Sequence, residues 1–213
     1  SVVRANATYG QSIVSYTGNA ASSATIAHGL SSAPEMIIVR QVGANAWAVY
    51  HTSIGNTHLL ELNTTAGKAD NNTFWNDTSP TSSVFTIGSH GEVNANNTGF
   101  ITYLWHSVTG YSKIGSYTGN GSANHAITGL GFEPAFLLIK RTNSAHDWVI
   151  TDNTRNPNEP LSLLANTTAA ESNQDGDDVS SFDADGFTVG VNARVNGNGD
   201  TYIYMAFADK REY

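Results

Sequence analysis

The sequence predicts an all-β protein made of two tandem antiparallel β-sandwich repeats, jelly-roll-like or immunoglobulin-like, of about 100 residues each. Three observations predict this class. Only 13% of the residues are charged and 20 are glycine, a composition that suits short strands and tight turns better than helices. The chain repeats itself. Within each copy, short apolar stretches recur at intervals close to those of sandwich strands.

The duplication has an offset of 101 residues. The sequence Ser-Tyr-Thr-Gly-Asn at residues 15–19 returns unchanged at residues 116–120, and Trp47 returns as Trp148. Other landmarks keep nearly the same spacing: Gly29-Leu30 with Gly129-Leu130, residues 36–40 with 136–140, residues 63–66 with 166–169, and residues 85–88 with 187–190. We therefore predict two β-sandwich domains, residues 1–110 and residues 111–213.

Seven β-like stretches are expected in the first copy, each bounded by Gly, Asn, Ser or Pro. They are residues 12–16, 24–28, 35–41, 46–52, 58–63, 83–87 and 100–108. No helix of ordinary length is evident, and residues 161–171 are the stretch that could form a helical turn or two. Because each sheet must bury one face, two packed sheets per copy are the simplest arrangement.

The last strand of each copy tests which side chains face inward. Ile101, Tyr103 and Trp105 alternate on one face and correspond to large apolar residues in the second copy, namely Ile203, Met205 and Phe207. The opposite face is also weakly polar, with Phe100, Thr102, Leu104 and His106 matching Tyr202, Tyr204, Ala206 and Ala208. We expect this second face to pack against a neighbouring copy or another subunit.

Charge and composition exclude several classes of partner. A formal net charge of −8 disfavours nucleic acid and anionic membrane surfaces. The chain has no cysteine, which excludes disulfides and thiolate metal sites. Its apolar runs are far shorter than the roughly 20 residues that span a bilayer, so no membrane insertion is expected. The chain begins at Ser1, and we expect it to be a segment of a longer protein.

Catalysis is not expected, and no catalytic residue or cofactor is assigned. The chain has no cysteine nucleophile and no Gly-x-Ser-x-Gly motif. None of its seven histidines has zinc-ligand spacing. Carboxylates that could serve glycoside hydrolysis cluster in Asp- and Gly-rich turns around residues 175–186, where these residue types are favoured for backbone reasons.

The same turns contain a weak candidate for a calcium site. Asp183 and Asp185 stand two residues apart before Gly186, and calcium takes several carboxylate oxygens as ligands. The twelve-residue calcium loop that ends in Glu is missing. A solvated hairpin turn is therefore the preferred interpretation, and no metal is assigned.

Sugar binding has two candidate locations. The first is Trp75 with Asn76 and Asp77, because an exposed indole can stack on a sugar ring beside amides and carboxylates that bind hydroxyl groups. The alternative is that Trp75 closes one end of the first sandwich. The second location is the polar loop of residues 152–160, with Asn153, Arg155 and Asn158 as candidate ligands. Its prolines could preset the loop for recognition or simply stiffen it.

The repeat units also resemble a known kind of sequence. The motifs that carry the resemblance are residues 15–19, 28–30, 34–39, 47–51, 62–65, 75–76, 82–85, 110–123 and 201–208. Together they are similar to a repeat of predicted tail or tail-fibre proteins of marine and cyanobacterial bacteriophages. The similarity covers nearly the whole chain. It supplies no catalytic or ligand residues, and it favours an architectural role for Trp75.

The resemblance implies a virion protein in the tail or its fibres, with the capsid exterior as the alternative. Its partners would be other virion proteins and a host-surface glycan or protein. A homo-oligomer is expected, and the resemblance favours a trimer. The leading hypothesis is a receptor-binding module without enzymatic activity. A structural spacer or decoration protein is the alternative, and a glycan-degrading tailspike is weaker because such enzymes are larger trimeric β-helices.

Overall fold

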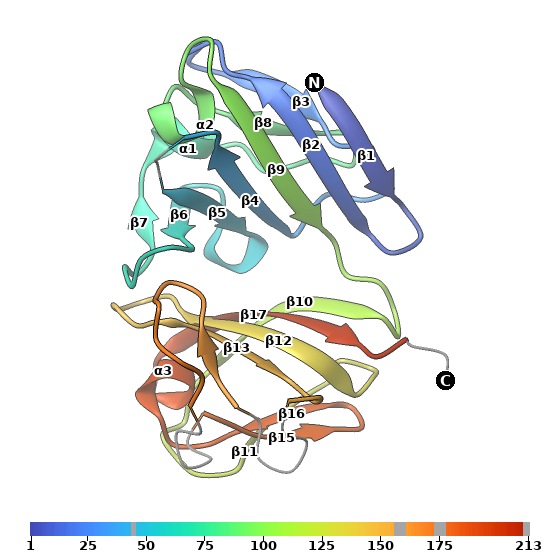
Figure 1. Cartoon of the computed structure of the whole chain (residues 1–213), viewed down its shortest axis with the longest axis vertical. Coiled ribbons are helices and arrows are strands. Elements are labelled where there is room, and N and C mark those ends of the chain that lie inside the picture. Colours follow the sequence, from blue (N-terminus) through green and yellow to red (C-terminus); the bar gives the residue numbers. More distant parts are fainter. Residues whose placement is uncertain (44–45, 156–160, 173–177, 211–213) are drawn as a thin grey trace. The chain divides into compact units, whose positions relative to one another are not determined.

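The computed structural model describes residues 1–43, 46–155, 161–172 and 178–210. The protein is predominantly β, with 45% of residues in strands and 8% in helices, which confirms the predicted class at that level. Every pairing of the described strands is antiparallel (Figure 1). The chain divides into two compact units, Ser1–Thr64 with Lys68–Ser107, and Thr65–Gly67 with Val108–Tyr213.

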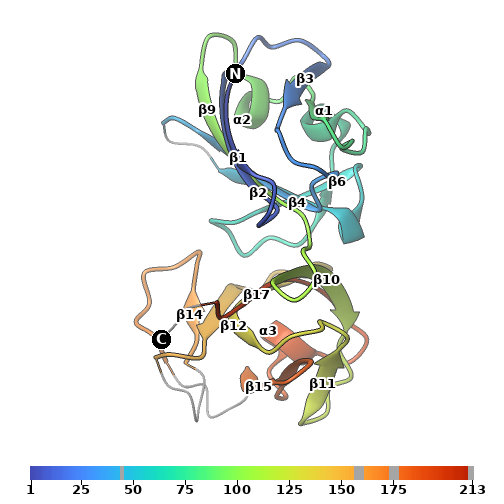
Figure 2. The same ribbon diagram turned by 90° about the vertical axis from the view of Figure 1, so that its right-hand side faces the viewer.

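The first unit contains a seven-stranded sheet in the order β1-β2-β9-β4-β5-β6-β7 and a two-stranded sheet of β3 and β8. The strands are β1 (Val2–Asn6), β2 (Gln11–Thr17), β3 (Ala24–Ala27), β4 (Met36–Gln41), β5 (Trp47–His51), β6 (His58–Glu61), β7 (Ala69–Asp70), β8 (Val84–Ile87) and β9 (Gly99–Trp105). The helices are η1 (Thr52–Ile54), α1 (Asn72–Trp75) and α2 (Gly91–Asn94). In Figure 2, α1, α2 and β3 lie on one side of the large sheet.

The second unit has the same strand order at its centre. A five-stranded sheet runs β10-β17-β12-β13-β14, and a three-stranded sheet runs β11-β16-β15. The elements are β10 (Ser112–Thr118), β11 (His125–Thr128), β12 (Pro134–Arg141), β13 (Trp148–Asp152), β14 (Leu163–Leu164), β15 (Val179–Asp183), β16 (Gly186–Val189), α3 (Ala193–Asn196) and β17 (Thr201–Ala208). The order β10-β17-β12-β13 repeats β2-β9-β4-β5, as expected of duplicated sequence. None of the described helices is long and apolar enough to span a lipid bilayer.

Two of the departures from the predicted elements concern strands. Residues 161–171 form no helical turn, because Leu163–Leu164 pairs with β13 and Ser162 bridges to Ser172. The backbone there finds its hydrogen bonds across strands, so that prediction was wrong. Strand β1 was not predicted, since four of its five residues are exposed and it lacks the apolar alternation by which strands are recognised.

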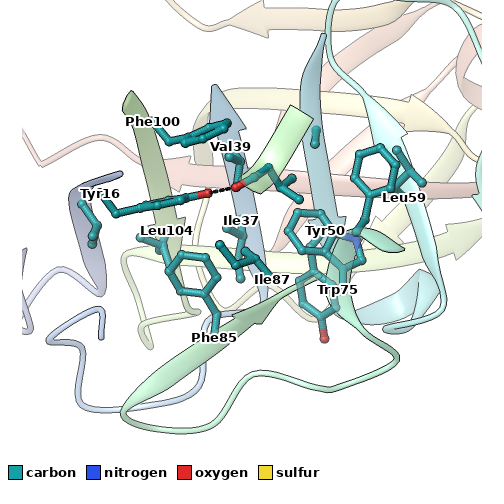
Figure 3. Packing of buried hydrophobic residues seen from close by; sticks show 14 of the residues in the cluster. Tyr16, Ile37, Val39, Tyr50, Leu59, Trp75, Phe85, Ile87, Phe100 and Leu104 are labelled. Atoms are coloured by element: carbon teal, nitrogen blue, oxygen red, sulfur yellow. Dashed lines mark hydrogen bonds between the residues drawn. The ribbon is translucent and has the colours of Figure 1, made fainter. Parts of the chain in front are cut away.

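The core of the first unit is built on aromatic side chains from strands far apart in the sequence (Figure 3). Tyr16 stacks on Phe100 with ring centroids 5.0 Å apart, and it meets Phe85 edge to face at 6.4 Å. The second unit repeats this arrangement, with Tyr117 stacked on Tyr202 at 5.0 Å. Aromatic pairs of this kind stabilise a core beyond their burial alone.

The predicted inward face of the last strand was wrong for the first unit, whereas Ile203 and Met205 on the corresponding face of the second unit are buried as predicted, although they lie outside the main cluster of that unit. Phe100 and Leu104 belong to the core of the first unit, whereas Ile101 is exposed. Likewise, Tyr202, Tyr204 and Ala206 belong to the core of the second unit. The face assigned to a neighbouring subunit is therefore the inner face of each unit itself. Both faces of the strand are apolar in sequence, so alternation alone could not tell them apart.

The repeated Ser-Tyr-Thr-Gly-Asn motif has a structural role, since its residues pack against and bond to the end of the short helix α2. The Tyr16 hydroxyl donates to the backbone oxygen of Val93 at 2.6 Å, and a β-carbon at Gly18 would collide with the backbone oxygen of Ala95. The backbone N–H of Asn19 donates to the side-chain oxygen of Asn94 at 2.9 Å. The motif thus fastens one end of β2 to the end of α2, which is an architectural function.

Candidate functional site

Trp75 lies in the core of the first unit. Its side chain is 1% exposed, it meets Tyr50 at a ring-centroid distance of 5.9 Å, and its Nε1 donates to the backbone oxygen of His58 at 3.1 Å (Figure 3). Helix α1 positions it there, with Asn71 as N-cap and Asn76 as left-handed C-cap. An indole in this position has no face open to a sugar ring, which corrects the first candidate location. The alternative interpretation, an architectural tryptophan, describes it.

Asn76 and Asp77 are exposed in the turn that follows α1. Both have a positive φ, 50° and 47°, a conformation that Asn and Asp adopt more readily than other side chains. The backbone oxygen of Asp77 accepts a hydrogen bond from Asn56 Nδ2 at 2.8 Å. These two residues therefore have a clear backbone role in ending the helix, and no described aromatic platform accompanies them.

The second candidate location, in the other unit, contains an ion-pair network. Arg155 bonds through Nε to Asp152 Oδ2 at 2.5 Å and through Nη1 to Glu171 Oε2 at 2.9 Å. Burial acts to raise the pKa of Asp152, but hydrogen bonds from Arg155 and Thr154 outweigh it and hold that pKa below its usual value. Through these two ion pairs, Arg155 stabilises the first residues of its loop. Asn153 lines an open groove of about 400 Å³, and Asn158 lies outside the described residues.

The calcium candidates use their oxygens within the protein. Asp183 accepts from Ser181 Oγ at 2.8 Å and from Thr188 Oγ1 at 2.7 Å. The Asp185 carboxylate accepts from the backbone N–H groups of Gly129 and Gly131 at 3.0 and 2.7 Å. Across the described residues, no three His, Asp or Glu side chains gather in a way that could hold a metal ion. Both aspartates fit the structural interpretation of a turn.

Replacing Asp185 by alanine is expected to lower the free energy of unfolding by about 1 kcal/mol, because two exposed backbone N–H groups lose a charged acceptor that water replaces only in part. Urea titration followed by far-ultraviolet circular dichroism measures this change. The isosteric Asp185→Asn keeps one acceptor oxygen and should lose less. A rise in Tm of the wild-type chain on addition of calcium, absent in Asp185→Ala, would contradict the structural interpretation.

Two of the histidines, His51 and His90, accept hydrogen bonds from backbone N–H groups at the start of short helices. His51 and His90 are N-cap residues, and their Nδ1 atoms accept from the N–H groups of Ser53 and Glu92 at 3.1 and 3.3 Å. His90 also stacks on Phe74 with ring centroids 3.9 Å apart. These contacts give His51 and His90 a structural role at the starts of η1 and α2.

A different location combines aromatic and polar side chains. A groove of about 480 Å³ lies over β1, β2 and β9 and is lined by Val3, Arg4, Ala5, Asn6, Gln11, Ser12, Ile13, Tyr103 and Trp105. Tyr103 and Trp105 stand two residues apart on β9, with nearly parallel rings whose centroids are 6.2 Å apart. Ile13 beside them is 50% exposed. These side chains point away from the core, since Val14, Thr102 and Leu104 occupy the inner positions.

Sequence reasoning missed this groove for a physical reason. Tyr103 and Trp105 were assigned to the inside, and β1, which supplies Arg4 and Asn6, was not recognised as a strand. The available signal was that Phe100, Leu104 and their counterparts also form an apolar face. Both faces of β9 are apolar, so predicting which face is buried requires knowing which strands pair with β9. Alternation in the sequence does not give that information.

These observations define a predominantly β protein whose two units share a strand order and whose first unit carries a groove of mixed aromatic and polar lining. A family model described as a domain of unknown function, DUF7483, matches residues 1–211, and the chain belongs to that family. No curated protein and no solved structure matches the chain.

Proposed function

We propose that this protein is a receptor-binding module of a virion, in the tail or its fibres, and that the groove over β1, β2 and β9 contacts the host surface. Each unit is an antiparallel β-sandwich in this proposal, with the small sheet packed over the large one. The groove is the observation that carries the proposal. The resemblance of the repeat to predicted tail proteins supports the virion location, and other virion proteins are the partners that hold the module there.

A binding role fits the chemistry of the described side chains better than catalysis does. Asp183 and Asp185 accept hydrogen bonds from their own chain, so they make poor general acids or bases for a substrate. Among the described residues that line the groove there is no carboxylate and no histidine. Aromatic rings beside amide and guanidinium groups recognise ligands without needing proton transfer.

The alternative of a structural spacer loses its main support. In a spacer, the weakly polar second face of the last strands would contact other virion proteins, but that face is the inner face of each unit. The groove has no role in a spacer, whereas a receptor-binding module requires such a surface.

Binding of the purified, fluorescently labelled chain to intact cells tests the proposal. A panel of marine bacteria and cyanobacteria is measured before and after enzymatic removal of surface polysaccharide, with an unrelated acidic β protein as the control. Binding to at least one strain above that control is the expected result. Absence of binding across the panel, together with location of the protein away from any host-contacting tip of a virion, would favour the spacer instead.

A further inference from the structure

The outer side chains of the groove are arranged in rows that cross three strands. Because β1, β2 and β9 are antiparallel neighbours in register, Asn6, Gln11 and Trp105 form one row. Arg4, Ile13 and Tyr103 form the next. Neighbouring strands lie about 4.8 Å apart, so each row is about 10 Å wide. Each row therefore has an aromatic ring at one end and a polar side chain at the other.

Several polar atoms of the groove have no protein partner in the described part of the chain. No hydrogen bond engages the Gln11 amide, the Tyr103 hydroxyl or the Trp105 Nε1, and none of these atoms is buried. The Arg4 guanidinium uses one N–H on the backbone oxygen of Val3, at 3.0 Å, and keeps its other donors. Hydrogen-bonding groups that stay open to solvent beside an apolar surface can exchange water for ligand hydroxyls.

The aromatic rings and the polar side chains of the groove match the two kinds of surface that a sugar presents. A pyranose ring has a face of C–H groups, which packs on aromatic rings, and a rim of hydroxyls, which needs donors and acceptors such as amides. Aromatic and aliphatic lining with a few placed polar groups is typical of small-ligand pockets, and about 480 Å³ is within their usual volume. A protein partner would need about 800 Å² of each surface, far more than six side chains offer.

The charge of the groove indicates whether it would bind an anionic or a neutral sugar. Arg4 is the only charged residue among the described residues that line the groove, in a chain whose net charge is −8. A guanidinium binds carboxylates through paired N–H groups. A cationic spot on an otherwise acidic protein favours an anionic ligand over a neutral one.

We infer that the groove binds a saccharide that carries a carboxylate. A sugar ring packs against Tyr103 and Trp105, Gln11 and Asn6 bind its hydroxyls, and Arg4 binds the carboxylate. This inference rests on the proposed function, since it names the ligand class of the same groove.

An array of acidic and neutral oligosaccharides probed with the full chain tests the inference, followed by calorimetric titration. Cellobiuronic acid and cellobiose make a matched pair, because they differ only in the carboxylate. We expect signals from acidic members only, and affinity about tenfold weaker for Arg4→Gln than for the wild type, because a charge-assisted hydrogen bond is lost. Lys68→Gln, which removes an exposed positive charge away from the groove, should bind like the wild type.

Two further variants examine the apolar part of the groove. Trp105→Ala should abolish binding. Its Tm should equal that of the wild type, which shows that the loss of binding is not caused by unfolding. Ile13→Glu avoids the risk of unfolding, because Ile13 is half exposed, and it places a negative charge where the carboxylated sugar would lie. It should also abolish binding.

The inference is overturned if no acidic saccharide binds at concentrations up to about 10 mM, if neutral sugars bind equally well, or if Arg4→Gln and Ile13→Glu bind like the wild type. The proposed function fails separately. Cell binding that persists in Ile13→Glu would keep the receptor-binding role and remove this groove from it. Saccharide binding without cell binding would keep the groove and remove the host-surface role.

Discussion

Replacing Asn196 by alanine is expected to lower the free energy of unfolding of the second unit by about 3 kcal/mol. The side chain is fully buried, and its amide donates to the backbone oxygens of Gly190 and Ser122 at 2.6 and 2.8 Å. Its oxygen accepts from the Asn120 N–H at 2.9 Å. Alanine would leave these backbone groups without partners, and each unsatisfied buried group costs about 1–3 kcal/mol.

Asn198 provides the matched control, because it is the same residue type two positions further on and is exposed. Asn198→Ala should change the stability by less than about 0.5 kcal/mol. Urea titration of both variants measures the difference. Asn94 makes the equivalent bonds in the first unit, to Gly88, Ala21 and Asn19, so Asn94→Ala should cost a similar amount. Equal stability of Asn196→Ala and Asn198→Ala would show that the network is dispensable.

Replacing Tyr204 by lysine is expected to unfold the second unit, with a loss of at least about 4 kcal/mol. Tyr204 is 5% exposed and lies against Phe187 and Tyr117, with ring centroids 5.3 and 6.3 Å away. Burial raises the pKa of its phenol to about 12, which indicates how poorly this position tolerates charge. A lysine ammonium there would lie beside the rings of Phe187 and Tyr117.

Tyr204→Phe is the control, because it keeps the ring and removes only the hydroxyl. Its stability should stay within about 1 kcal/mol of the wild type. Differential scanning calorimetry would show the transition of the second unit lost in Tyr204→Lys and kept in Tyr204→Phe. A folded Tyr204→Lys chain with an altered oligomeric state would restore the original expectation that this face contacts another subunit.

The sequence predicted the strands well because the duplication shows the same apolar stretches twice. Predicted residues 24–28, 35–41 and 46–52 coincide closely with β3, β4 and β5. An apolar stretch that recurs at a fixed offset is a more reliable strand signal than a single stretch. The four-residue helices were missed, since they are set by capping residues such as Asn71, His90 and Asn192 and are too short to show a helical period.

The candidate site could not be predicted in the same way. Apart from Phe74, Trp75 has polar neighbours in sequence, but its neighbours in space are apolar because α1 turns it inward. Conversely, Trp105 has an apolar sequence context and yet lines an open groove. Which side of a strand meets solvent depends on tertiary pairing, and for a strand apolar on both faces that information is absent from local sequence.

The number of binding grooves per chain depends on which parts of the first unit are duplicated in the second. The repeat copies the core strands, but β1, which supplies Arg4 and Asn6, has no counterpart among the described strands of the second unit. Tyr103 and Trp105 correspond there to Met205 and Phe207. The described part of one chain thus contributes a single copy of the groove despite its duplicated framework. Under the proposed receptor-binding role, firm attachment to a surface would depend on avidity, with several chains held side by side so that individually weak contacts act together.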